Sequence, residues 1–256
     1  MGGIPATATI IACNESENIL DCIKSVDFFD EILVIDSGST DDTVAVAEKA
    51  GARVIHNPWL GFSRQKQFGF NEAAHDWVFS IDADERVTPR LKQSLLELFA
   101  GPSRSPQYNG YLINRCNHFM GQALRHGEGY PDWLLRFSNR TQARWSGDQV
   151  HEKIQLSGEK GRLVGDLDHY TEDRIGSYLD KQNKYTTLQA RNLFEQGKRA
   201  SGWKLFASPL VRFIKFYFLR LGFLDGVPGF VHISIGCANS FCKYAKLHEL
   251  QNDKAD

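Results

Sequence analysis

The sequence predicts an α/β protein organised around a parallel sheet. Over the first hundred residues, short runs of apolar and β-branched side chains alternate with segments of helical periodicity, and four such strand-and-helix pairs follow one another. The length of 256 residues and the hydrophobic share of 42% allow one large domain, or a core domain with an appendage. They exclude a chain that is disordered throughout.

Each of the four pairs has its own local signals. The strands are expected at residues 7–13, 31–36, 52–57 and 77–84, with a helix after each. Ser39 and Asp42 offer a capping box for the second helix. Thr88 as N-cap with Pro89 at the first helical position is typical of the start of the fourth helix.

The regular alternation stops at a loop over residues 101–110. Four strand-like runs follow, joined by Gly-rich and charged connections, which favours an antiparallel extension over further βα units. These runs cover residues 111–119, 133–139, 150–156 and 161–167, and a long helix is expected over 175–195. The sequence therefore divides into a βα half (1–100), a second half of the same domain (101–172) and a C-terminal helical extension (173–256).

The composition restricts the class of partner and the compartment. The chain has 30 Lys and Arg against 31 Asp and Glu, and its net charge of −1 excludes a globally basic nucleic-acid-binding protein. Five cysteines without a CxxC pair argue against a disulfide framework or a zinc site and favour a reducing compartment. The first residues lack the basic and apolar regions of a signal peptide, so a cytoplasmic protein is expected.

Acidic and amide side chains follow three of the predicted strands. Asp82 and Asp84 close the fourth strand, Asp36 closes the second, and Asn14 and Glu15 follow the first. Ligands of open α/β sheets bind at the carboxyl ends of the strands. Two carboxylates at i and i+2 can chelate a hard divalent cation that also binds phosphate oxygens, whereas an acidic loop that caps the next helix is the alternative. Acids on neighbouring strand ends favour the binding crevice.

Three segments resemble the nucleotide-binding segments of a known family. TIIACNESENI, EILVIDSGSTDDT and WVFSIDADE are similar, in order and spacing, to those of the inverting family 2 glycosyltransferases with the GT-A fold. The DADE form, the GFSRQKQ and WSGDQVHEK segments and the length resemble the bacterial lipopolysaccharide core glucosyltransferases within that family. The resemblance implies a Rossmann-like nucleotide-binding sheet with an antiparallel acceptor-side extension and C-terminal helices.

The resemblance also implies how a UDP-sugar donor is held. Asn14, Glu15 and Asp36 would line the uridine pocket, and Asp82 would lie near the ribose. Asp84 would ligate Mn²⁺ or Mg²⁺ on the diphosphate. On this view residues 1–100 bind the nucleotide sugar, and 101–172 supply the acceptor side and the catalytic group.

Three further residues are expected at the site, each with a structural alternative. Lys66 stands where many members of the family have an arginine, and a solvated helix face is its alternative. His169 matches a histidine that would add a metal or phosphate contact, but a lone histidine can also be purely structural. Arg136 is expected to hold the diphosphate or the acceptor, with surface charge as the alternative.

Inverting transfer needs a base that removes the proton of the attacking acceptor hydroxyl. The carboxylate pair that the family usually carries there is missing, and the candidates in GDQVHEK are Asp148 and Glu152. Glu152 is preferred because His151-Glu152 matches the subgroup pattern. Strand alternation would place residues 148, 150 and 152 on one face.

The resemblance implies the transfer of a hexose, with glucose expected, from a UDP-sugar to a lipid-linked acceptor of the lipopolysaccharide core. Another surface polysaccharide or glycolipid acceptor is one alternative, and a non-catalytic nucleotide-sugar-binding module is the other. A sugar nucleotidyltransferase or a Rossmann dehydrogenase is disfavoured, because no Gly-rich phosphate loop follows the first strand.

The C-terminal extension suggests where the protein works. No run reaches the roughly 18 uncharged apolar residues of a membrane span. Basic residues gather without acids in one aromatic-rich stretch: Lys198, Arg199, Lys204, Arg212, Lys215 and Arg220. An amphipathic helix over 209–224, capped by Ser208 and Pro209, would dock on the inner face of the cytoplasmic membrane as a peripheral element. A core helix or a dimer contact is the alternative.

Overall fold

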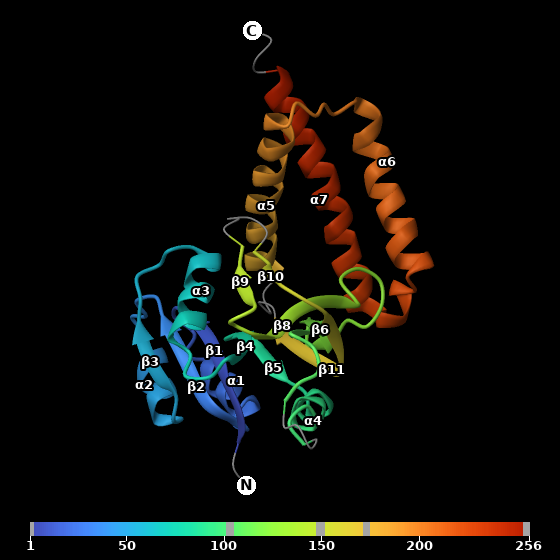
Figure 1. Cartoon of the computed structure of the whole chain (residues 1–256). Helices are drawn as coiled ribbons and strands as arrows, with labels where there is room; N and C mark the ends of the chain where they lie inside the picture. Colours follow the sequence, from blue (N-terminus) through green and yellow to red (C-terminus); the bar gives the residue numbers. More distant parts are fainter. Residues whose placement is uncertain (1–2, 101–104, 147–151, 171–174, 253–256) are drawn as a thin grey trace. The chain divides into compact units, whose positions relative to one another are not determined.

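The computed structural model describes residues 3–100, 105–146, 152–170 and 175–252 (Figure 1). Two compact units make up the chain. The first comprises Met1–Arg115 and Asp132–His169, and the second comprises Cys116–Pro131 and Tyr170–Asp256. The division at residues 100 and 172 made from the sequence stays a prediction.

A four-stranded parallel sheet forms the N-terminal part of the first unit. The strands β1 (Ile4–Ala12), β2 (Phe29–Asp36), β3 (Arg53–His56) and β4 (Trp77–Asp82) lie in the order β3-β2-β1-β4. The helices α1 (Ile19–Ser25), α2 (Thr43–Lys49) and α3 (Phe62–Glu72) connect them, and α4 (Pro89–Glu97) follows. The predicted succession of strands and helices is therefore confirmed.

Antiparallel strands extend this sheet beyond β4, as predicted. They are β8 (Asp132–Asn139), β6 (Gly110–Phe119), β11 (Lys160–Tyr170) and β5 (Glu85–Val87), in that order, with β7 (Gln122–Ala123) beside β6. A separate hairpin consists of β9 (Ala143–Trp145) and β10 (Ile154–Leu156). The strand predicted to begin at residue 150 begins only at Ile154, so Glu152 precedes it.

Strand β1 shows why the sequence pattern is a continuous apolar run. Side chains on both of its faces are buried, among them the adjacent Ala8 and Thr9, as expected where helices cover both sides of a parallel sheet. Aromatic rings continue the core across the sheet, where Phe29 stacks on Phe79 at 5.5 Å and Trp77 stacks on Phe137 at 5.0 Å between ring centroids. This core fixes the strand ends that carry the polar side chains.

One of the two predicted helix starts is correct. Thr88 caps α4 by accepting a hydrogen bond from the Leu91 amide, with Pro89 in the first turn. The capping box of α2 does not form, because Asp42 makes no side-chain cap bond and the Ser39 hydroxyl donates to Asp36 instead. The buried carboxylate at the end of β2 competes successfully for the serine.

The second unit is mainly helical. It contains α5 (Ile175–Glu195), α6 (Gly202–Phe213), the π-helical turn η1 (Ile214–Leu219), the 3₁₀ turn η2 (Gly222–Asp225) and α7 (Gly226–Asn252), and α7 packs against both α5 and α6 (Figure 1). The helix α5 has the predicted bounds. Among the described residues, no single helix meets the length and hydropathy of a membrane span, although Gly202–Leu219 and Gly222–Asn252 do so together as a pair bent by 76°.

The predicted helix at 209–224 is wrong in its bounds. The helix starts at Gly202, seven residues before Pro209, and the regular α-helical pattern gives way to η1 after Phe213. Pro209 removes a single backbone donor, and the helix continues past it into the wider η1 turn.

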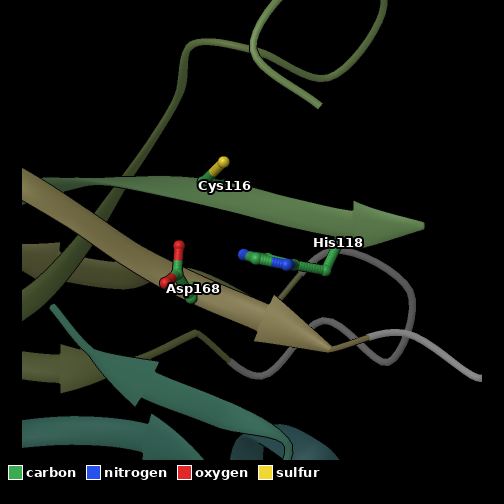
Figure 2. Close-up of side chains that lie close together, drawn as sticks. All are labelled: Cys116, His118 and Asp168. Atoms are coloured by element: carbon green, nitrogen blue, oxygen red, sulfur yellow. The ribbon is translucent and has the colours of Figure 1, made fainter. Parts of the chain in front are cut away.

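The part of β6 that belongs to the second unit contains Cys116 and His118. These residues are two positions apart, so their side chains lie on the same face of the strand. Asp168 lies on β11, directly before His169 (Figure 2).

Gly165 on β11 is expected to tolerate no side chain. Its φ is +108°, and a Cβ would lie 2.7 Å from Leu91 Cα and 2.8 Å from the Arg90 carbonyl carbon. We predict that Gly165→Ala lowers the free energy of unfolding by about 2–5 kcal/mol, from backbone strain and overpacking together. Gly51→Ala is the control, because Gly51 has a φ of +90° but no atom near its Cβ position. Equal losses in urea unfolding of the two variants would contradict the packing argument.

Candidate functional site

The ends of β1 and β2 are joined through the Ser37–Thr40 loop. The buried Asp36 carboxylate accepts hydrogen bonds from the Gly38 amide at 2.9 Å and from Ser39. Burial alone would raise the pKa of Asp36, but these donors outweigh it and lower the pKa. Asn14, at a φ of +58°, accepts from the Thr40 amide at 2.8 Å. The predicted uridine residues Asn14 and Asp36 thus hold one loop at the sheet edge.

Glu15 lies next to this loop and the start of α1. Its backbone amide donates to the Thr43 hydroxyl at 2.8 Å, and its carboxylate accepts from the Asn18 side chain at 3.0 Å. Burial raises the pKa of Glu15 above its usual range. Glu15 and Asp84 also interact electrostatically, so the ends of β1 and β4 share one acidic edge.

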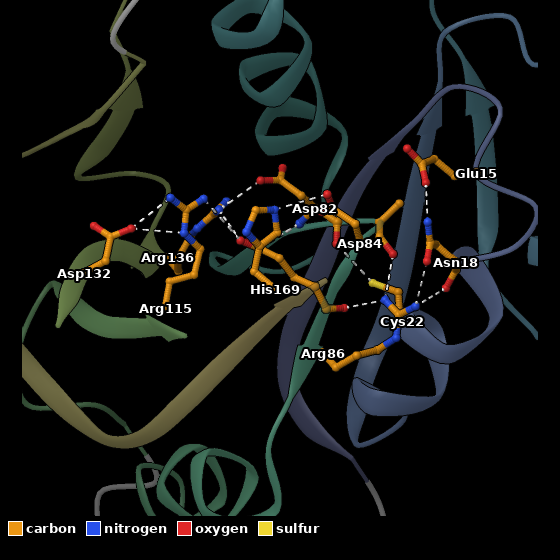
Figure 3. Close-up of polar contacts among 12 residues, drawn as sticks. Glu15, Asn18, Cys22, Asp82, Asp84, Arg86, Arg115, Asp132, Arg136 and His169 are labelled. Carbon is orange, nitrogen blue, oxygen red and sulfur yellow. Dashed lines mark hydrogen bonds and ion pairs between the residues drawn. The ribbon is translucent and has the colours of Figure 1, made fainter. Parts of the chain in front are cut away.

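Asp82 at the end of β4 is held between two cations, of which Figure 3 labels Arg136. Its Oδ1 lies 2.9 Å from Lys66 Nζ, and its Oδ2 accepts from Arg136 Nη2 at 2.9 Å. Burial opposes the charged carboxylate, but Lys66 and then Arg136 outweigh this effect and hold the pKa of Asp82 well below its usual range. Lys66 and Arg136 are buried, with side chains 4% and 5% exposed, so a solvated helix face and a surface charge are both wrong for them.

Glu85 was not singled out in the sequence, yet it anchors this network. Its side chain is fully buried, accepts from Arg136 Nη2 at 2.7 Å and accepts from the Asp82 amide at 3.0 Å. Burial raises the pKa of Glu85, against the attraction of Arg136. Arg115 approaches Glu85 at 3.9 Å and pairs with Asp132 at 2.8 Å. The available signal was the third acid of DADE, which the sequence alone does not mark as buried.

The two acids of the DAD segment have different surroundings. Both oxygens of Asp82 lie against cations, so joint chelation of one metal ion by Asp82 and Asp84 does not match this geometry. Asp84 Oδ2 lies 3.2 Å from His169 Nε2, and both side chains are partly exposed (Figure 3). A carboxylate oxygen and an imidazole nitrogen are ordinary ligands of Mn²⁺, so this pair fits a metal ion better than the two aspartates do.

A pocket of about 440 Å³ lies beside Asp82 within the first unit. Its lining contains acidic and basic side chains and two indole rings. The candidate functional residues among them are Lys66, Asp82, Trp133, Trp145 and Glu152. Glu152 Oε1 accepts from Lys66 Nζ at 2.9 Å. The other candidate base, Asp148, lies outside the described residues, and so does the predicted alternation of residues 148, 150 and 152.

Two side chains of the stretch Arg125–Gly129 have partners within the second unit. His126 Nδ1 lies 2.8 Å from the buried Asp225 carboxylate. Glu128 pairs with Arg212, which also donates to the Ser240 hydroxyl at 3.2 Å.

A parallel sheet with an antiparallel extension and acids at its strand ends is the architecture of the GT-A fold class. The sequence pattern described as "Glycosyl transferase family 2" matches residues 7–156, and the chain belongs to this family. The fold class expected from the resemblance is confirmed.

Several proteins are similar to the chain over most of its length. The lipopolysaccharide core biosynthesis glycosyltransferase LpsC of Rhizobium meliloti is 33% identical over 98% of this chain and 95% of its own length. An uncharacterized glycosyltransferase of Rickettsia conorii is 32% identical over 95% and 89%. Among solved structures, glucosyl-3-phosphoglycerate synthase from Mycobacterium tuberculosis with Mn²⁺, UDP and glucosyl-3-phosphoglycerate matches with a TM-score of 0.44 at 20% identity, covering 78% of this chain and 82% of that one.

The Arg136–Glu85 contact is expected to be essential for stability. Arg136→Met leaves Glu85 buried without its cation, and removal of one partner of a buried ion pair costs about 3–5 kcal/mol. We predict a loss of that size in chemical unfolding at neutral pH. Arg136→Met combined with Glu85→Gln should recover part of it, and an equally unstable double variant would contradict the assignment of the loss to the orphaned carboxylate.

Proposed function

We propose that the protein is an inverting glycosyltransferase that moves a hexose, glucose first among the candidates, from a UDP-sugar to an acceptor sugar of a lipopolysaccharide core. The observation that carries the proposal is that a candidate base, a donor-side carboxylate and a candidate metal-binding pair belong to one unit. Glu152 and Asp82 line the same pocket. Asp84 follows Asp82 by two residues and lies beside His169. Similarity to LpsC over nearly the full length supports the lipopolysaccharide acceptor.

On the donor side, Asn14, Glu15 and Asp36 border the uridine, and Asp82 approaches the ribose. Asp84 and His169 would hold Mn²⁺ or Mg²⁺ against the diphosphate, where a bound cation supplies stabilisation of the charge on the leaving group. Asp82 is paired with two cations and is therefore held ionised in a defined orientation.

On the acceptor side, Glu152 acts as the general base. The acceptor oxygen forms a bond to the anomeric carbon, the bond from that carbon to the diphosphate oxygen breaks, and the acceptor proton passes to the Glu152 carboxylate. UDP leaves with the bonding electron pair. The indole rings of Trp133 and Trp145 provide apolar walls of the pocket for a sugar ring.

The second unit supports a peripheral location on the inner face of the cytoplasmic membrane. Trp203, Phe206 and Leu219 are each about three-quarters exposed, and further apolar side chains of η1, η2 and α7 are also exposed. The stretch 198–224 contains six basic residues and no acid, and Asp225 is buried against His126. Exposed aromatic rings beside basic side chains suit an anionic lipid surface.

The first test of this function is metal-dependent turnover. Incubation with UDP-glucose and other UDP-sugars in the presence of Mn²⁺ should release UDP, faster with a lipopolysaccharide acceptor. Asp84→Ala should abolish Mn²⁺-dependent UDP binding in calorimetry and leave the folded state intact. Asp76→Ala, at an exposed acid elsewhere in the first unit, is the matched control. Metal-dependent UDP binding without release from any UDP-sugar would favour a non-catalytic binding module.

The second test separates the two candidate bases. Glu152→Gln should still bind the UDP-sugar and should lose about 10² to 10⁴ in kcat, the usual contribution of a positioned base. Asp148→Asn should retain turnover. If the two results are exchanged in steady-state assays, Asp148 is the base and Glu152 is not.

The third test concerns the membrane. Arg212 is unsuitable for a charge reversal because it pairs with Glu128, so the exposed Lys215 and Arg220 are changed to Glu together. Co-sedimentation with anionic vesicles should fall in this variant and at high salt, since each basic side chain contributes about 1 kcal/mol near such a surface. Lys24→Glu with Lys49→Glu, in the first unit, is the control. Equal binding to neutral and anionic vesicles, or a salt-independent dimer, would contradict docking by charge.

A further inference from the structure

The ammonium group of Lys66 occupies an unusual position between two acids. Lys66 lies in the middle of α3, and its side chain is 4% exposed. Its Nζ lies 2.9 Å from Asp82 Oδ1, 2.9 Å from Glu152 Oε1 and 5.1 Å from the centre of the Trp145 ring. A buried ammonium requires such partners, because burying an unpaired charge is costly.

This arrangement leaves Lys66 little capacity for a ligand. An ammonium has three N–H donors, and the two carboxylates occupy two of them. A direct contact of Lys66 with the substrate would have only the remaining N–H donor to use. The helix is itself tied to the pocket wall, because the neighbouring Gln67 side chain accepts from the Trp145 amide at 2.8 Å.

Glu152 has one fixed oxygen and one that remains for chemistry. Oε1 is held by Lys66, whereas Oε2 is buried and has no hydrogen-bond partner among the residues that the structure describes. Unsatisfied buried polar atoms are rare and often belong to sites that bind or react. The described charged groups that line the pocket with Glu152 are Lys66 from α3, Asp82 at the end of β4, Arg115 from β6, Arg136 from β8, the adjacent Lys153 and Lys160 from β11.

We infer that Lys66 is a positioning residue of the transfer reaction, which orients Glu152 through Oε1 so that Oε2 meets the acceptor hydroxyl. The inference rests on the proposed function and assigns Lys66 a role that donor binding does not include. Lys66 keeps its proton throughout, and the proton of the acceptor goes to Glu152. Because Lys66 also holds Asp82, the base is oriented relative to the same carboxylate that lies on the donor side.

The test compares Lys66→Met, Lys66→Arg and Arg64→Met, the last an exposed cation on the same helix. Lys66→Met should lower kcat about 10- to 100-fold, a range found for directly coupled residues, with the KM for UDP-sugar unchanged. Lys66→Arg should restore part of kcat, and Arg64→Met should behave as the wild type.

A double-variant cycle separates this inference from the proposed function. In the Glu152→Gln background, Lys66→Met should reduce the residual rate less than twofold, since its effect passes through Glu152. A raised donor KM with an unchanged kcat, or an equal loss in both backgrounds, would overturn the positioning role. Full activity of Glu152→Gln would instead overturn the base assignment. If Lys66→Met does not fold, as thermal unfolding would show, Lys66→Arg in the same cycle decides the question.

Discussion

The arrangement of the first unit depends on the charged carboxylate of Asp82. This residue lies where the sheet, the pocket and the helix α3 meet. Lys66 and Arg136 neutralise it from two elements, and Arg136 is itself fixed by the fully buried Glu85. Groups buried in this way are stable only when all of them are present, because each one removes the desolvation cost of its neighbour. The network therefore gives the first unit a rigid arrangement of charges before any ligand binds.

The two acids of the DAD segment divide the chemistry between them. Asp82 is saturated by protein cations, whereas Asp84 is open and lies beside His169. Asp82 is thus suited to a fixed electrostatic and hydrogen-bonding role, whereas Asp84 is suited to binding a ligand that exchanges. The same local sequence supplies both because β4 ends at Asp82 and the chain turns there into β5.

The sequence predicted the elements whose signals are local. Strand β1 is a continuous apolar run because it is buried on both faces. The helix α4 starts at Pro89, and the Thr88 hydroxyl caps it by accepting a hydrogen bond from the Leu91 amide, three residues further on. The strand ends and the family resemblance also led to Asp36, Asp82, Asp84 and His169 as candidate site residues, and their roles stay predictions. Contacts over long separations were not predictable: Lys66 and Glu152 are 86 residues apart, and no pattern shows that Glu85 is the buried acid. The start of α6 was missed because proline favours the first turn of a helix over its interior, whereas α6 continues through Pro209.

The proposed mechanism is a single displacement in which Glu152 activates the acceptor opposite the leaving UDP. Its most direct test is the anomeric configuration of the product, read by NMR from the coupling constant of the transferred sugar's anomeric proton. With α-linked UDP-glucose as donor, we expect a β-glucoside as the first-formed product. An α-glucoside would show net retention and would contradict the proposed mechanism.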